Sequence, residues 1–393
     1  MATPDPDSRR EHAIAREARH LLPVYAQLDV EPVRAEGVWI HTADGRRIID
    51  FYGGHAVTAL GYGHPRLVRT LAEQAATLLF QSNAVALDVR ARAAERLANF
   101  APNGLDHAFF VNSGAEANEN ALRLALRATG RNRVIALEHG FHGRTAAAAA
   151  VTWGSERWYG FPARPFDVTF VARDDADALA AAIDDRTAAV ILEPVQGVAG
   201  AWALPFELMQ TARAACDRHG AWLISDEVQS GMGRSGMPFA ISRAGVTPDA
   251  ITAAKSLGGG FPVGALLLRG DHLGGLAKGD LGTTYGGGPL ACAMVEAVID
   301  TIESDALIDA VAARSARIAE KCITGPITGV QGAGLLLGLR TSRPAGEVGA
   351  ALLERDIMTG GSADPHVVRL LPPYILEDDH VAQLAAALAD IGA

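Results

Sequence analysis

The chain has 393 residues, of which 49% are hydrophobic and 20% are charged, and its formal net charge is −10. This is the composition of a globular protein with room for two domains. The acidic balance disfavours nucleic acid and anionic membranes as partners, and no apolar run approaches the ~18 residues of a membrane helix. The cysteines lack metal-ligand spacing and no apolar run follows Arg9-Arg10, so we expect a cytoplasmic protein without a secretory or twin-arginine signal.

The first expected element is a β-hairpin within residues 33–50. Two apolar runs in this segment flank Asp44-Gly45, which is a turn signal. We assign residues 1–50 to an N-terminal segment and hairpin that packs with a small domain.

From about residue 106 to residue 269, apolar strand-like runs alternate with helix-like runs. The expected strands are 107–111, 133–137, 168–171, 188–192, 221–225, 250–252 and 263–268. The expected helices between them include 115–129, 176–183 and 206–219. Such alternation predicts an α/β fold with a mostly parallel, buried central sheet flanked by helices. We assign residues 51–285 to this large domain.

The pattern changes after residue 285, where long helices are expected at 290–303, 307–323 and 378–391. A glycine-rich strand candidate lies at 330–339. We therefore assign residues 286–393 to a smaller α+β domain.

Two residues that could carry chemistry follow expected strands. Asp226 ends the run 221–225, and Lys255 follows the run 248–254. Ligands of open parallel sheets bind beyond the carboxyl ends of the strands. An amine and a carboxylate there suit pyridoxal phosphate, because the amine forms a Schiff base and the carboxylate keeps the pyridine nitrogen protonated. For this pair alone, a surface lysine and a helix-capping aspartate are the alternative.

Three further motifs stand at strand ends. Ser113 opens an expected helix, where free N–H groups suit a phosphate, although a plain helix cap has the same pattern. Phe141 could stack on a flat ring, and Glu193 faces the same sheet edge as Asp226. His139 and His142 lack a partner at metal-ligand spacing, so we expect no metal. The run 231–236 matches G-x-G-x-x-G, but it neither follows a strand directly nor opens a helix, which argues against a dinucleotide.

As a set, these motifs resemble the class III pyridoxal-phosphate-dependent aminotransferases. The resemblance extends from about Leu21 to the C-terminus and is carried by six motifs in order: 112–119, 141–145, 193–197, 226–236, Lys255 and 283–292. It implies the fold type I of pyridoxal-phosphate enzymes, a large domain with a smaller one.

The resemblance also implies roles for single residues. Lys255 and Asp226 are the expected catalytic residues, as Schiff-base lysine and partner of the pyridinium nitrogen. The expected cofactor-binding set adds Ser113, Gly114 and Ala115 for the phosphate, Phe141 for the ring face, Gln229 for the ring hydroxyl, and His142 and Glu193. Thr284 is expected to reach the phosphate of a neighbouring subunit, which makes a homodimer with shared active sites the functional unit. The expected substrate-binding set is Tyr25, Arg144 for a distal carboxylate and Arg369 for the α-carboxylate.

The implied reaction is ping-pong transfer of the δ-amine of a donor such as N-acetylornithine to 2-oxoglutarate. The same chemistry has alternative substrates: succinylornithine, ornithine, 4-aminobutyrate or a lysine-pathway semialdehyde. There are also alternative functions on the same fold, namely a decarboxylase, an aminomutase or a non-enzymatic cofactor-binding regulator. The chain departs from the family at Val198, where a glutamate often stands, at Gly288 and at His55.

Overall fold

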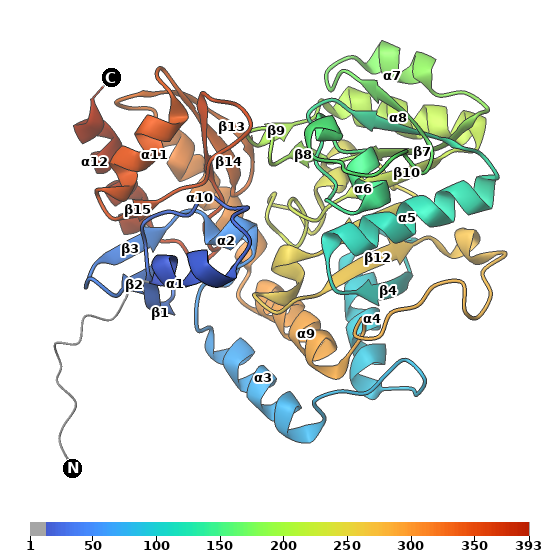
Figure 1. Cartoon of the computed structure of the whole chain (residues 1–393), viewed down its shortest axis with the longest axis horizontal. Helices are drawn as coiled ribbons and strands as arrows, with labels where there is room; N and C mark the ends of the chain where they lie inside the picture. The colour runs from blue at the N-terminus through green and yellow to red at the C-terminus, as the bar shows by residue number, and fades with distance from the viewer. Residues whose placement is uncertain (1–12, 393) are drawn as a thin grey trace.

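The computed structural model describes residues 13–392, so Arg9-Arg10 lies outside the described residues. Its centre is a seven-stranded sheet in the order β4-β12-β11-β10-β7-β5-β6 (Figure 1). The strands are β4 (His107–Val111), β5 (Arg133–Leu137), β6 (Asp167–Val171), β7 (Thr187–Leu192), β10 (Trp222–Asp226), β11 (Ala250–Ala253) and β12 (Gly264–Leu268). All seven lie within one or two residues of the expected runs.

The central sheet is mostly parallel, as predicted. β6, β5, β7, β10 and β11 pair in parallel, whereas β12 runs antiparallel to both of its neighbours. All residues of β7 and β10 are buried. Continuous burial is what a parallel sheet covered on both faces requires, and it explains why these runs are apolar throughout.

Helices cover both faces of the sheet. On one face, α5 (Gly114–Thr129) and α6 (Ala146–Ala150) share a core with alternate residues of the strands, such as Val134 and Ile191. On the other face, the intervening residues pack with α8 (Phe206–His219) and α9 (Pro289–Ser304). The remaining helix of this series is α7 (Ala176–Ala182), which packs against α8.

The first strands of the chain join the last part of it. β1 (Pro32–Glu36), β2 (Trp39–Thr42) and β3 (Arg47–Asp50) form antiparallel pairs, and β2 and β3 make the expected hairpin around Asp44-Gly45. β3 then pairs in parallel with β15 (Ile357–Met358), which completes a four-stranded sheet. In Figure 1 this sheet lies beside α11 and α12, away from the central sheet.

The expected strand at 330–339 is a hairpin instead. β13 (Ile327–Ala333) and β14 (Leu336–Thr341) pair antiparallel, and β14 also pairs with β16 (Val367–Leu370). Gly334 turns the chain with φ of +56°, and a Cβ there would lie 2.4 Å from the Arg234 carbonyl oxygen. Glycine alone adopts this conformation at such close approach without strain.

The other helices surround these sheets. They are α1 (Ala13–His20), α2 (Gly53–Ala56), α3 (Pro65–Thr77), α4 (Asp88–Phe100), α10 (Leu307–Lys321), α11 (Ala345–Leu353) and α12 (Asp378–Ile391). Two short strands, β8 (Val195–Gln196) and β9 (Trp202–Ala203), pair antiparallel. The described residues also contain four 3-10 turns: η1 (Ser155–Arg157), η2 (Ala240–Ala244), η3 (Lys255–Gly258) and η4 (Gly270–Leu273). Within residues 13–392, no helix is both long and apolar enough to cross a membrane.

Candidate active site

A cavity lies at the carboxyl ends of the parallel strands. Its volume is about 720 Å³, and it is lined from β10, the loops after β4, β5, β7 and β11, the N-terminus of α5, and β16. All but one of the expected catalytic, cofactor-binding and substrate-binding residues line this cavity. They are Tyr25, Ser113, Gly114, Ala115, Phe141, His142, Arg144, Glu193, Asp226, Gln229, Lys255 and Arg369. The exception is Thr284, which is exposed and lies outside this lining.

Lys255 is the second residue after β11 and the first residue of the turn η3. Its φ of +48° is in the left-handed region, which is uncommon for a residue with a Cβ. Burial lowers the pKa of the Lys255 amine, and the negative charges of Asp226 and Glu193 only partly oppose this effect. The amine therefore loses its proton more readily than a surface lysine, as a nucleophile or a proton acceptor must.

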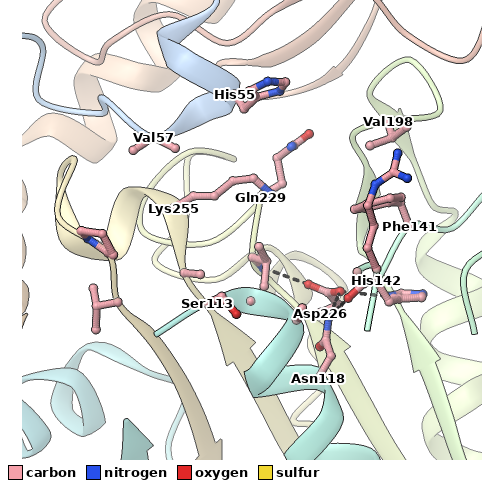
Figure 2. A pocket seen from close by; sticks show the side chains of 18 of the residues that line it. His55, Val57, Ser113, Asn118, Phe141, His142, Val198, Asp226, Gln229 and Lys255 are labelled. Carbon is pink, nitrogen blue, oxygen red and sulfur yellow. Dashed lines mark hydrogen bonds and ion pairs between the residues drawn. The ribbon is translucent and has the colours of Figure 1, made fainter. Parts of the chain in front are cut away.

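Asp226 ends β10 beside β11, and its side chain is 3% exposed. Oδ2 accepts hydrogen bonds from Asn118 Nδ2 at 2.7 Å and pairs with His142 Nδ1 at 2.8 Å. Oδ1 accepts the backbone N–H of Val228 at 3.0 Å. Figure 2 shows this network on the floor of the cavity, with Lys255 between it and His55. The network fixes the orientation of a buried carboxylate.

His142 forms an ion pair with Asp226 below the cavity. Burial by itself lowers the pKa of His142, but the hydrogen bond that Nδ1 donates to Asp226 and the charges of Asp226 and Glu193 raise it overall. His142 therefore holds a proton more readily than an exposed histidine, and its N–H orients the buried Asp226 carboxylate. Within the described part of the chain, His142 Nε2 is buried without a hydrogen-bond partner.

Glu193, in the loop after β7, and Gln229, in the loop after β10, both line the cavity. Burial raises the pKa of Glu193 to about 7, and its Oε1 accepts the backbone N–H of Phe141 at 2.8 Å. A Cβ at Gly197 would lie 1.6 Å from Gln229 Oε1, so only glycine lets the amide pass there. That oxygen is buried and has no partner among residues 13–392, which leaves it available to a ligand.

The N-terminus of α5 opens into the cavity. Ser113 is its N-cap with extended backbone, and Ser113 Oγ accepts the Glu116 N–H at 3.2 Å. The first N–H groups of a helix have no partner within it and lie at the positive end of the helix dipole. Gly114 and Ala115, at the first two positions, therefore give the cavity an anion-binding end.

The expected substrate-binding residues differ in burial. Arg369 on β16 is 6% exposed; its Nε donates to the Gly361 carbonyl, and within residues 13–392 its buried Nη1 has no partner. Arg144 is exposed, and its guanidinium lies 4.6 Å from the ring centre of Trp158. Tyr25 is 85% exposed at the edge of the cavity. Two arginines thus offer separate sites for carboxylates.

Sequence reasoning missed Asn118 and Thr252. Asn118 Nδ2 also donates to the His142 carbonyl, and Asn118 Oδ1 accepts the Thr252 hydroxyl at 2.7 Å. The sequence did contain a signal for Asn118, because it is a polar residue on the buried face of α5, together with Ala117, Ala121 and Leu122. A polar residue on a buried stripe needs partners from other elements.

Comparisons with known proteins agree with this geometry. The family model described as aminotransferase class-III matches residues 23–391. Acetylornithine aminotransferase 1 of Bradyrhizobium diazoefficiens is 40% identical over 392 residues, which covers 95% of this chain and 96% of the relative. A Pseudomonas aeruginosa relative named succinylornithine transaminase/acetylornithine aminotransferase is 40% identical, with 92% of each chain covered. Among solved structures, an ornithine aminotransferase from Toxoplasma gondii superimposes with a TM-score of 0.90 at 26% identity, covering 96% of this chain and 93% of that one.

Proposed function

This chain belongs to the class III aminotransferase family, and on that premise we propose that it transfers the δ-amine of N-acetylornithine to 2-oxoglutarate. It is a pyridoxal-phosphate-dependent aminotransferase, with a small-molecule amine and a keto acid as substrates. The observation that carries the proposal is that Lys255, Asp226 and Arg369 line one cavity.

The residues of the cavity fit pyridoxal phosphate. The helix end at Ser113 suits a phosphate, and the unpartnered Gln229 Oε1 suits a ring hydroxyl. Asp226, already oriented by Asn118 and His142, would hold a proton on the pyridine nitrogen. Phe141 lines the same space and would lie against the ring.

When bound, the cofactor supplies an aldehyde that condenses with amines and a protonated ring that accepts electrons. Lys255 would yield its position to the incoming amine and then move a proton from the carbon that bears that amine. Its lowered pKa suits this role, because a proton acceptor must be neutral before it acts. Asp226 would keep the pyridine nitrogen protonated, since its carboxylate is buried and held in place by hydrogen bonds.

Arg369 and Arg144 would position the substrates. Arg369 has a buried, unpartnered Nη1 among the described residues, and a carboxylate would satisfy it with a charge-assisted bond. Arg144 would hold the second carboxylate of 2-oxoglutarate. Tyr25 would cover the bound substrate, because it already lines the cavity.

Two relatives support the choice of donor, since their names refer to acetylornithine. The Pseudomonas relative is also named for succinylornithine, so a succinylated donor is the second candidate. The two donors share a carboxylate, an acylated nitrogen and a terminal amine, and they differ in the acyl group.

We further propose a homodimer with active sites shared across the interface. Exposed apolar side chains gather on α3 and the loop after it, and they support a contact surface there: Val68, Leu71, Leu78, Leu79 and Phe80. Tyr285 packs on Phe80 and neighbours Thr284, which does not line the cavity of its own chain. This supports the role of Thr284 in the phosphate site of a partner subunit.

A cytoplasmic location remains part of the proposal. All three cysteines are buried and unpaired, which suits a reducing compartment.

A donor panel tests the proposed function. The purified enzyme is mixed with single amines, and loss of the absorbance of the bound cofactor is followed in one half-reaction. We expect N-acetylornithine to react fastest, ahead of N-succinylornithine, ornithine and 4-aminobutyrate. No reaction with N-acetylornithine, or a faster reaction with an unacylated amine, would contradict the proposal.

A further inference from the structure

Arg234 is a buried arginine that does not line the cavity. It lies in the loop after β10, and its side chain is 0% exposed. Nη1 donates to the carbonyl oxygens of Leu335, at 3.3 Å, and Pro372. Within residues 13–392, Nε and Nη2 are buried without a hydrogen-bond partner. Burying a guanidinium on carbonyl oxygens alone costs free energy of folding, so stability does not account for this arginine.

The two carbonyl groups belong to the strands around Arg369. Pro372 lies just beyond the end of β16, the strand that carries Arg369. Leu335 comes directly before β14, in which Gly338 pairs with Arg369. The Arg234 carbonyl also accepts the Leu335 N–H at 2.8 Å. One arginine thus holds the end of the strand that carries Arg369 and the start of the strand beside it.

Tyr374 connects the same segment to the turn that carries Lys255. The Arg234 guanidinium lies 4.6 Å from the ring centre of Tyr374, whose hydroxyl donates to the Met232 carbonyl at 2.9 Å. Burial raises the pKa of this hydroxyl, and the charge of Arg234 and the nearby hydroxyl of Ser256 oppose the rise. Ser256 directly follows Lys255. Tyr374 is therefore packed between Arg234 and the neighbour of the catalytic lysine.

The separation of Arg369 and Lys255 matters to only one kind of substrate. A substrate with a carboxylate on its reacting carbon must reach Arg369 with that carboxylate and Lys255 with the same carbon. An error of about 1 Å in such a geometry can cost about 10²-fold in rate. A terminal amine has only hydrogen atoms on that carbon, so it makes no such demand on Arg369.

We propose that Arg234 is a positioning residue for substrates that carry a carboxylate on the reacting carbon. Together with Tyr374, it holds Arg369 at the distance from Lys255 that such a substrate requires. This inference rests on the proposed function, in which 2-oxoglutarate and its product glutamate bind Arg369. Arg234 acts only through the strands around Arg369, because it does not line the cavity itself.

The test compares glutamate with N-acetylornithine in the half-reaction that consumes the absorbance of the bound cofactor. Of the two amines, glutamate alone has a carboxylate on its reacting carbon. The rate constant divided by the apparent dissociation constant is measured for the wild type, Arg234→Met, Arg234→Lys and Tyr374→Phe. Methionine keeps an apolar chain without hydrogen bonds, and lysine keeps the charge without the planar fork. Bound-cofactor absorbance and thermal unfolding verify that each variant is folded and loaded.

Two further variants calibrate the comparison. Arg369→Ala should lower the value for glutamate far more than that for N-acetylornithine, which establishes that the ratio of the two reports on Arg369. Arg131→Met is the matched control, because Arg131 Nη1 also donates to two carbonyl oxygens, of Thr187 at 2.8 Å and His219 at 2.7 Å, but does not line the cavity. It should leave the ratio within about twofold of wild type.

We expect Arg234→Met to lower the value for glutamate by about tenfold or more, since a displaced Arg369 makes a poorer charge-assisted bond to the carboxylate. The value for N-acetylornithine should stay within about threefold of wild type. Arg234→Lys should recover part of the loss, and Tyr374→Phe should show part of it. If Arg234→Met does not fold, these two milder variants decide, and both should lose more on glutamate than on N-acetylornithine.

Equal losses on both amines would overturn the inference, because a merely structural residue affects both half-reactions. An equal change of the ratio in Arg131→Met, or an unchanged ratio in Arg369→Ala, would overturn it as well. The proposed function is judged separately, from which terminal amine the wild type converts fastest. If that amine is not N-acetylornithine, it takes the place of N-acetylornithine in the comparison, and Arg234 is judged from the new ratio.

Discussion

Single side chains in the cavity owe their properties to burial. Burial favours the neutral form of an ionisable group, so it lowers the pKa of Lys255 and raises that of Glu193. His142 is the exception, because its direct pairing with Asp226 outweighs its burial. The amine of Lys255 thus gives up its proton more readily than a surface lysine, which suits a residue that must accept a proton during amine transfer.

The first prediction concerns Lys255. Lys255→Ala removes the proposed proton carrier, so turnover should fall by at least about 10²–10⁴-fold, the usual contribution of such a group. The variant should keep its fold, since the Lys255 side chain makes no hydrogen bond to any other described residue. Steady-state kcat and the thermal unfolding midpoint are measured together. Turnover within tenfold of wild type would show that another group moves the proton.

The second prediction concerns Asn118. Asn118→Ala removes one of the hydrogen bonds that hold buried Asp226 and the acceptor of the buried Thr252 hydroxyl, so the free energy of unfolding should fall by about 1–3 kcal/mol. Asn120→Ala on the same helix is the control, because the half-buried Asn120 side chain donates to the Glu116 carbonyl of its own helix and bonds no other element among the described residues. Denaturant titrations should show a larger loss of unfolding free energy for Asn118→Ala than for Asn120→Ala. Equal losses would mean that the hydrogen bonds of Asn118 to Asp226 and Thr252 do not stabilise the fold.

The third prediction uses the pKa of Glu227. This buried carboxyl accepts the Ile241 N–H and the Ser230 hydroxyl, and burial raises its pKa from 4.5 to about 7. A raised pKa means that folding favours the protonated form, so this contribution to stability is present at low pH and is lost as pH rises through about 7.

Glu227→Gln stays neutral at every pH. Its free energy of unfolding should therefore gain on that of the wild type by up to about 3 kcal/mol between about pH 5 and pH 8. Denaturant titrations of both proteins across this range measure the difference. A difference that does not change with pH would show that Glu227 is ionised in the fold throughout.

At the scale of elements, the phosphate end of the cavity depends on how closely β12 approaches the start of α5. A Cβ at Gly264 would lie 2.4 Å from the Ser113 carbonyl oxygen, so the first residue of β12 touches the turn that opens the helix. Because glycine has no side chain, the backbone of β12 packs directly against the N-terminus of α5. This contact fixes the position of the free N–H groups at the start of the helix.

The fourth prediction follows from this contact. Gly264→Ala should lower the free energy of unfolding by about 1–3 kcal/mol through overpacking, and it should weaken pyridoxal phosphate binding. Gly274→Ala is the matched control, because no atom lies within 4 Å of its Cβ position and its φ is −58°. That variant should be unchanged or about 0.4–1 kcal/mol more stable. Equal stability of both variants would contradict the close packing.

At the scale of the whole molecule, the division of the chain into 1–50, 51–285 and 286–393 remains a proposal. Pairing of β3 with β15 supports the packing of the first segment with the last domain. α9, assigned to the last domain, packs against α3 and α4 and so links it to the large one. Movement between the domains would change the distance from Arg369 to Lys255, since β16 and β11 belong to different sheets.

The fifth prediction concerns the proposed dimer. Phe80 is 42% exposed and packs on Tyr285, which is 67% exposed, so Phe80→Asp should place a charge in the proposed interface and dissociate the dimer. Phe206→Asp is the control, since Phe206 is also exposed but starts α8, far from α3 in Figure 1. Analytical ultracentrifugation measures the assembly. A Phe80→Asp protein that stays dimeric, or a wild type that is monomeric, would reject the surface.

The sequence alone determined the central sheet, because continuous apolar runs between helical runs suit only strands covered on both faces. It also indicated Lys255 and Asp226, since residues that end parallel strands reach the same edge. Only the tertiary structure decided the partners of Asp226, the hairpin at Gly334 and the position of His55 on the same cavity as Arg369. These contacts join residues far apart in the chain, and their geometry depends on packing rather than on any local pattern.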